Sequence, residues 1–146
     1  VVNRVHPSLK AEAIFSELEM PCRHASGQAT VYLGGPVQAS EVFILHGRPF
    51  DAGVSLVITP WLALSTSREV LARIALGKGP EAFVISLGCA GWGPGQLEAE
   101  IRQNAWLTSD IDENIMFDVP VEARWERAMR QLGIDPALLI GAAGHA

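Results

Sequence analysis

The sequence lacks the features of several large classes of protein. Its 146 residues contain no apolar run near the roughly 18 residues that a membrane-spanning helix needs. Its first residues do not resemble a signal peptide. Only two cysteines are present, Cys22 and Cys89, and they form no CxxC motif. Two isolated thiols favour a reducing compartment over a disulfide framework, so we expect a cytoplasmic protein without membrane contact.

The sequence also lacks the residue spacing of metal-binding motifs and long runs of basic residues. The four histidines, at 6, 24, 46 and 145, are scattered, and no HExxH motif occurs. This predicts neither a metal site nor a cofactor. The net charge is −5, and the densest basic stretch, Arg124 to Arg130, is interleaved with glutamates. Because DNA binding needs a basic surface, we do not expect direct DNA binding.

The 49% hydrophobic content is that of an ordinary globular chain. Apolar periodicity and Gly/Pro punctuation predict strands and helices in almost equal number. The expected strands are 30–33, 42–45, 55–58, 82–87 and 105–109, and the expected helices are 8–19 (capped by Ser8), 96–104, 120–132 and one from the competing caps Ser65, Thr66 and Ser67 to 76. Strands and helices do not alternate strictly. We therefore predict a single α+β domain over 1–146, with a mixed or mainly antiparallel sheet flanked by helices.

The most unusual segment is residues 88–98, where glycines alternate with Trp92 and a proline between a strand and a helix. Gly91, Gly93 and Gly95 spell GxGxG, which is neither the dinucleotide fingerprint nor a Walker A motif. Glu98 in the first helical turn would repel a phosphate. Two interpretations stay open: a tight elbow that packs Trp92, and a ligand or partner site.

Three other side chains are candidates for chemistry. Cys89 lies near a helix N-terminus, an environment that can activate a thiol, although free cysteine more often fills a core. His46 ends a strand, and it either is a satisfied edge histidine or faces the elbow. Glu98 and Glu100 do not form a catalytic pair, because residues two apart do not share a helix face.

Several of these segments together resemble the AlgH/YqgE family of bacterial proteins. The resemblance rests on Val1-Val2-Asn3-Arg4, Gly34-Gly35-Pro36-Val37, His46, Gly88-x-Ala90-Gly91-Trp92-Gly93-x-Gly95-Gln96-Leu97-Glu98-x-Glu100-Ile101, Trp106-Leu107, Trp125, Leu132-Gly133-Ile134 and Gly144-His145-Ala146. It implies an α+β fold and a bacterial cytoplasm, and it implies that N-terminal strands of the family fold are missing here. Members are labelled uncharacterised proteins or transcriptional regulators, so the resemblance implies no activity. At Cys89 the family often has an aromatic residue, which counts against a functional thiol.

We therefore predict a non-enzymatic regulatory or binding module that acts through a protein or small-molecule partner, as a monomer or weak homodimer. Its expected site combines two glycine turns and a histidine, namely Gly34, Gly35, Pro36, His46, Gly91, Trp92, Gly93, Gly95, Gln96 and Glu98. One alternative is an enzyme that uses His46 or Glu98 as acid or base beside the elbow. Another is a redox sensor that works through Cys89.

Overall fold

A computed structural model describes residues 1–51 and 53–137. The chain divides into two compact units, Val1–Gly91 and the part that begins at Trp92. Mixed strand pairing and the accompanying helices give an α+β architecture, as the sequence predicts. That residues 1–146 form a single domain stays a prediction.

The first unit contains a six-stranded sheet in the order β1-β2-β6-β3-β5-β4. The strands are β1 (Val5–Lys10), β2 (Thr30–Leu33), β3 (Val37–His46), β4 (Leu56–Thr59), β5 (Leu62–Ser65) and β6 (Phe83–Cys89). Strands β2 and β6 pair in parallel, and the other neighbours pair antiparallel. The sheet is therefore mixed and mainly antiparallel, with β6 and β3 at its centre.

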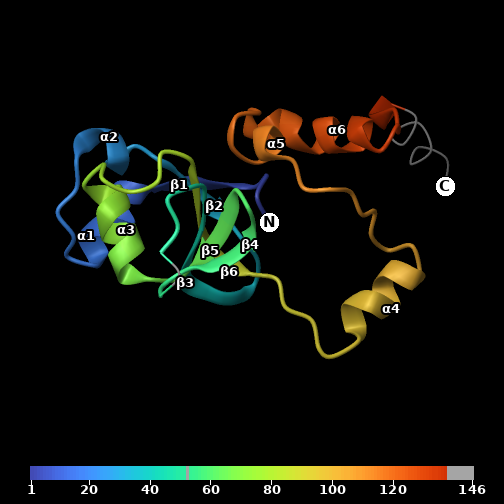
Figure 1. The fold of residues 1–146 in the computed structure, drawn as a ribbon, viewed down its shortest axis with the longest axis horizontal. Helices are drawn as coiled ribbons and strands as arrows, with labels where there is room; N and C mark the ends of the chain where they lie inside the picture. The colour runs from blue at the N-terminus through green and yellow to red at the C-terminus, as the bar shows by residue number, and fades with distance from the viewer. Residues whose placement is uncertain (52, 138–146) are drawn as a thin grey trace. The chain divides into compact units, whose positions relative to one another are not determined.

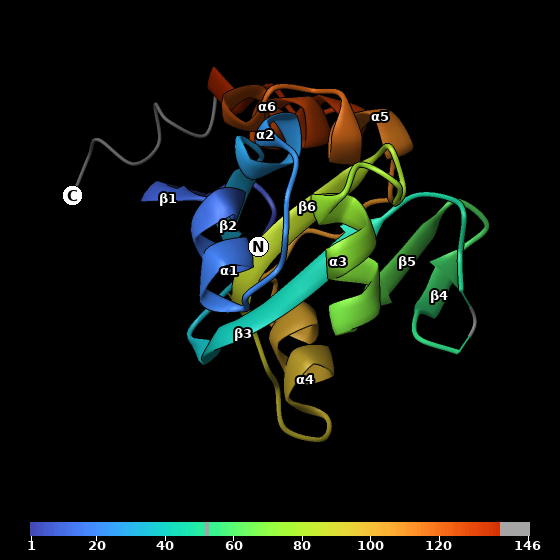
Figure 2. The ribbon, with the colours of Figure 1, turned by 90° about the vertical axis from the view of Figure 1, so that its left-hand side faces the viewer.

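Helices cover one face of this sheet. They are α1 (Ala11–Glu17), α2 (His24–Gly27) and α3 (Arg68–Ala75), and both views place α1 and α3 side by side on that face (Figures 1 and 2). Their apolar sides meet Val31, Ile44 and Ile85 of the sheet to form the core. Burial of these fully enclosed side chains supplies the main favourable free energy of folding.

Local side-chain and backbone interactions determine where α3 begins and ends. Of the three competing caps, Ser67 caps the helix, because its side chain accepts a hydrogen bond from the backbone N–H of Glu69. Ser65 instead donates its hydroxyl to the Val54 carbonyl. Gly77 ends the helix at φ +64°, a left-handed conformation that suits glycine.

The structure corrects three sequence-based expectations. Residues 5–10 form strand β1, and the helix that follows begins at Ala11 rather than after a Ser8 cap. The expected strand 105–109 is not formed, and all of residues 101–110 are exposed. Strand β5 was not expected, since its four residues are too short to show a period.

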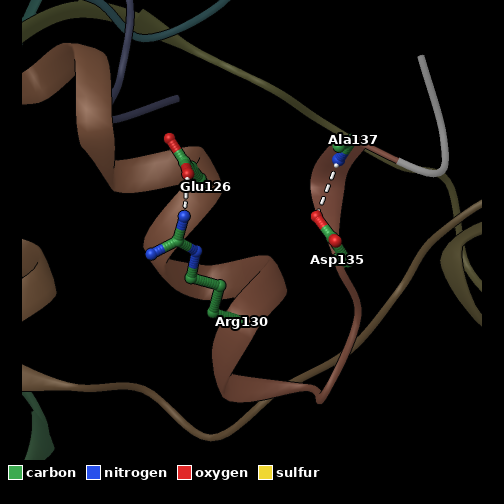
Figure 3. Close-up of polar contacts among 4 residues, drawn as sticks. All are labelled: Glu126, Arg130, Asp135 and Ala137. Atoms are coloured by element: carbon green, nitrogen blue, oxygen red, sulfur yellow. Dashed lines mark hydrogen bonds and ion pairs between the residues drawn. The ribbon is translucent and has the colours of Figure 1, made fainter. Parts of the chain in front are cut away.

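The second unit is helical in its described part. Its helices are α4 (Gln96–Arg102), α5 (Glu113–Phe117) and α6 (Val121–Gln131), and α5 packs against α6. Glu126 and Arg130 form an ion pair one turn apart on α6, and the Asp135 carboxylate accepts the backbone N–H of Ala137 beyond it (Figure 3). The terminal Gly144-His145-Ala146 lies outside the described residues.

Candidate functional site

The glycines of the first unit join two chain segments backbone to backbone. A Cβ on Gly34 would lie 2.0 Å from the Gly88 carbonyl oxygen, and one on Gly35 would lie 2.3 Å from the Cys89 carbonyl oxygen. Gly88 has φ +70°, and its own Cβ would lie 2.3 Å from the Gly35 carbonyl oxygen. No side chain fits at these contacts, so the glycines have a structural reason to be there. Pro36 is exposed beside them, and Gly91 faces Val37 at ordinary contact distance.

His46 is enclosed and fully engaged. The side chain is 1% exposed. Its Nδ1 lies 2.8 Å from the Gly47 carbonyl, which can only accept, so Nδ1 donates. Its Nε2 lies 3.0 Å from the Ser55 hydroxyl. The imidazole also meets the Phe50 ring edge to face.

The strand register separates His46 from the glycine contact. His46 pairs with Phe83 at the start of β6, whereas Val37 pairs with Cys89 at its end. His46 therefore lies at the opposite end of β6 from Gly34 and Gly35, and the structure does not bring the two together.

Two adjoining grooves lie on the helical face of the first unit. One, of about 330 Å³, is mostly apolar and is lined by Leu9, Ala13, Ile14, Glu17, Leu18, Ser40, Val42 and Leu87. The other, of about 280 Å³, is lined by Leu18, Ser40, Glu41, Val42, Ile44, Thr66, Ser67, Arg68 and Leu71. Neither groove contains His46 or Glu98. The first groove therefore offers apolar contact, whereas the second is lined by polar as well as apolar side chains.

Cys89 is half-buried at the end of β6. Its Sγ lies 4.0 Å from Oε1 of Gln38, whereas Cys22 is exposed. The residue that ends the strand thus has a weak polar neighbour and partial access to solvent. A redox role for Cys89 stays a prediction.

In the second unit, Gln96 connects the glycine turn to α4. Its side-chain Oε1 accepts the backbone N–H of Gly93 at 3.0 Å. Its Nε2 donates to Oε1 of Glu100 at 2.9 Å, one helical turn further on. Gly95, at φ +74° with open space around it, is the N-cap residue and makes the change of direction possible. The turn and the first two turns of α4 are thereby held as one piece.

Glu100 is the centre of this arrangement. Its Oε2 accepts the indole N–H of Trp106 at 2.6 Å and that of Trp92 at 3.2 Å. The two indole rings meet edge to face, with centroids 5.8 Å apart and planes at 75°. One carboxylate therefore orients two tryptophans that are fourteen positions apart in the chain.

These hydrogen bonds also act on the charge of Glu100. Hydrogen bonds from Trp106, then Gln96, then Trp92, hold the pKa of the Glu100 carboxyl below its usual value, because all three donors favour the ionised form. The carboxylate therefore stays ionised to a lower pH than an ordinary glutamate.

The tryptophan pair is open to solvent. Trp92 is 38% exposed and Trp106 48% exposed. Ile101, which follows Glu100, and Leu107, which follows Trp106, are exposed as well. Large aromatic rings on a surface, held in place by hydrogen bonds, are typical anchors of protein interfaces.

The expected site residues thus fall into two groups with different surroundings. Trp92, Gly93, Gly95 and Gln96 take part in the turn around Glu100, while Glu98 is exposed and is not among the residues that bind the Glu100 carboxylate. The sequence-based site omitted Glu100 and Trp106. The Gln96–Glu100 spacing of four was the available signal for Glu100. Trp106 was marked only by its place in the family resemblance, and its contact with Glu100 depends on the fold of residues 103–106.

The described residues give little support to metal, membrane or nucleic-acid sites. Across 1–51 and 53–137, no three His, Cys, Asp or Glu side chains gather as metal ligands, and no helix is long and apolar enough to cross a membrane. On α6, Arg124 is buried and donates to the Val119 carbonyl, and Arg130 pairs with Glu126. The densest basic stretch of the sequence is therefore partly committed to intramolecular contacts.

Comparison with known proteins gives a consistent result. The family model described as AlgH-like matches residues 1–137. A UPF0301 protein of Desulforapulum autotrophicum is 47% identical over 134 residues, covering 92% of this chain and 71% of that protein. One from Bordetella petrii is 45% identical over 147 residues, covering 100% and 72%. The solution structure of the AlgH protein from Pseudomonas aeruginosa matches with a TM-score of 0.77 and 44% identity, over 100% of this chain and 77% of that one. The chain belongs to the AlgH-like family.

Proposed function

We propose that this protein is a non-enzymatic binding module of the bacterial cytoplasm, and that it engages a protein partner through the exposed surface formed by Trp92, Trp106 and Glu100. We call this surface the tryptophan surface. The observation that carries the proposal is the pair of indole rings oriented by one carboxylate. A surface whose rings are already oriented loses little conformational entropy on binding.

Several observations weigh against catalysis at the residues considered for it. The buried His46 has both ring nitrogens engaged, so it offers no free nitrogen to a substrate. Glu98 is exposed on α4. A general acid or base needs a reacting atom held beside it in an enclosed site.

A regulatory role, which some family labels suggest, fits a binding module better than direct reading of DNA. The chain is acidic overall, and a base-reading helix needs a basic surface around it. A partner protein would then carry any contact with nucleic acid. The expected assembly state without partner is a monomer or weak homodimer.

The test is a comparison of two single substitutions at exposed tryptophans. Trp106→Ala removes a ring of the tryptophan surface, and Trp125→Ala removes a ring of similar exposure (46%) on α6. The full-length protein and both variants are used to capture partners from the lysate of a bacterium that encodes it, and captured proteins are identified by mass spectrometry. Each candidate is then purified, and its dissociation constant is measured by calorimetry.

The proposal predicts a purified partner whose affinity falls by about tenfold or more with Trp106→Ala, because truncating a hot-spot tryptophan costs about 2 kcal/mol or more. Trp125→Ala should leave the affinity within about twofold, as expected for a residue outside the interface. Equal weakening by both variants, or the absence of any partner that binds in purified form, contradicts the proposal. Circular dichroism of each variant checks that the fold is retained.

A further inference from the structure

The two rings of the tryptophan surface form a corner. Their planes stand at 75° and their centroids are 5.8 Å apart, so the edge of one indole meets the face of the other. Both indole N–H groups point at Oε2 of Glu100. The carboxylate therefore lies at the N–H edges of the rings, and the two tryptophans stay 38% and 48% exposed.

The segment that carries the corner is acidic. Besides Glu100, residues 92–112 contain three further carboxylates, at 98, 110 and 112, against one basic side chain, Arg102. The face of an indole carries negative potential and attracts cations, with tryptophan the strongest of the aromatic residues. The carboxylate and the ring faces therefore both attract a positively charged ligand.

We propose that this corner binds a positively charged side chain, a lysine or arginine, of the partner protein. The cation packs against the indole faces, and the Glu100 carboxylate supplies the opposite charge beside them. This inference rests on the proposed function and names the chemistry that the partner presents at the tryptophan surface.

Neutral and anionic groups fit the corner less well. A neutral apolar side chain would gain contact with the rings but would leave the charge of Glu100 without a counterpart. An anionic side chain would meet a carboxylate that its donors keep ionised. Charge complementarity therefore selects a basic residue as the occupant.

The four tryptophans of the chain provide a direct test. Each gives one indole N–H signal in a ¹⁵N-correlated NMR spectrum, so Trp92 and Trp106 report on the corner while Trp61 and Trp125 serve as internal controls. The probe is an end-blocked leucine–lysine–leucine tripeptide added to the full protein at constant ionic strength. The matched control is the same tripeptide with the lysine Nε acetylated, which removes the charge and keeps the chain.

We expect the lysine peptide to shift the Trp92 and Trp106 signals about threefold or more per unit concentration relative to the acetylated peptide, as a cation–π contact of ordinary strength implies. The Trp61 and Trp125 signals should move equally little with both peptides. Glu100→Gln, which keeps the shape and one of the two acceptor oxygens but removes the charge, should reduce the difference between the peptides. Trp106→Ala should abolish it.

Equal shifts with the charged and acetylated peptides, or a difference that Glu100→Gln leaves intact, overturn the inference. That outcome is separable from failure of the proposed function. If Trp106→Ala still weakens the purified partner while the lysine charge has no effect, the surface is a docking site with a neutral anchor. If neither the partner nor the peptide depends on Trp106, both proposals fail.

Discussion

Trp92 and Trp106 donate their indole N–H groups to the same oxygen atom, Oε2 of Glu100, at 3.2 Å and 2.6 Å. The other oxygen of this carboxylate accepts the amide of Gln96. Each ring is thereby tied to the first turns of α4 although neither ring belongs to that helix. The orientation of the tryptophan surface depends on one ionised side chain, and this dependence leads to the first prediction.

We predict that Glu100 titrates below the ordinary range of glutamates, because its three donors stabilise the charged form. A carboxyl whose pKa is lowered by folding stabilises the native state fully above its unfolded pKa, about 4.3, and loses that contribution as pH falls through the folded pKa. A pH titration of the Glu100 side-chain carboxyl ¹³C signal measures this directly. Trp106→Phe removes the donor with the largest effect and should raise the pKa, and an unchanged pKa in that variant would show that the hydrogen bonds do not cause the shift.

The second prediction concerns the contact between Gly88 and Gly35. Gly88→Ala should destabilise the protein well beyond the roughly 1 kcal/mol that left-handed backbone alone costs a non-glycine residue, because the new Cβ overlaps the Gly35 carbonyl. Gly77→Ala is the matched control, with φ +64° and only the flexible end of Arg23 nearby. Urea unfolding curves followed by far-ultraviolet circular dichroism compare the two. Similar midpoints for both variants would mean that the backbone contact is not needed.

The third prediction separates stability from function at His46. His46→Ala should lower the free energy of unfolding by roughly 3 kcal/mol, since it removes a buried ring and leaves the Ser55 hydroxyl and the Gly47 carbonyl without their partner. Affinity for the partner, measured on the folded fraction, should stay unchanged. A variant that folds normally but binds poorly would instead place His46 in the binding site.

The fourth prediction addresses the thiols. Cys22 should react with a thiol reagent before Cys89 in the native protein, because Cys22 is exposed and Cys89 is half-buried. Mass spectrometry of tryptic peptides after short labelling times gives the order. Cys89→Ser and Cys22→Ser identify each signal, and faster reaction at Cys89 would revive the redox-sensor alternative.

Local patterns were sufficient for much of the architecture. Strand β2, helix α3 and helix α6 lie close to their predicted positions, because each has a clear apolar pattern and a stop signal such as Gly77. The last three residues of the first strand, 8–10, were assigned to a helix. Its residues Val5–Lys10 are stabilised by pairing with β2, which no local pattern reveals.

The candidate site was likewise only partly predictable from the sequence. Glycine-rich turns at 34–35 and 88–95 were visible in the sequence, but their meaning was not. The first proves to be a backbone contact between β2 and β6. One of the two interpretations of His46 placed it beside the glycine turns. It lies at the other end of β6, because β3 runs antiparallel to β6 and His46 pairs with Phe83.

The sequence by itself determined the family, the α+β class and the acidic charge of this protein, since these follow from residue types and their local order. Only the tertiary structure decided which polar groups meet. The joining of Trp92 and Trp106 at Glu100 depends on the path of the chain through α4 and the turn after it, and the burial of His46 depends on the hydrogen bonds of its ring to Gly47 and Ser55. Hydrogen bonds and ring contacts act over a few ångströms, so they depend on positions in space that residue order alone does not specify.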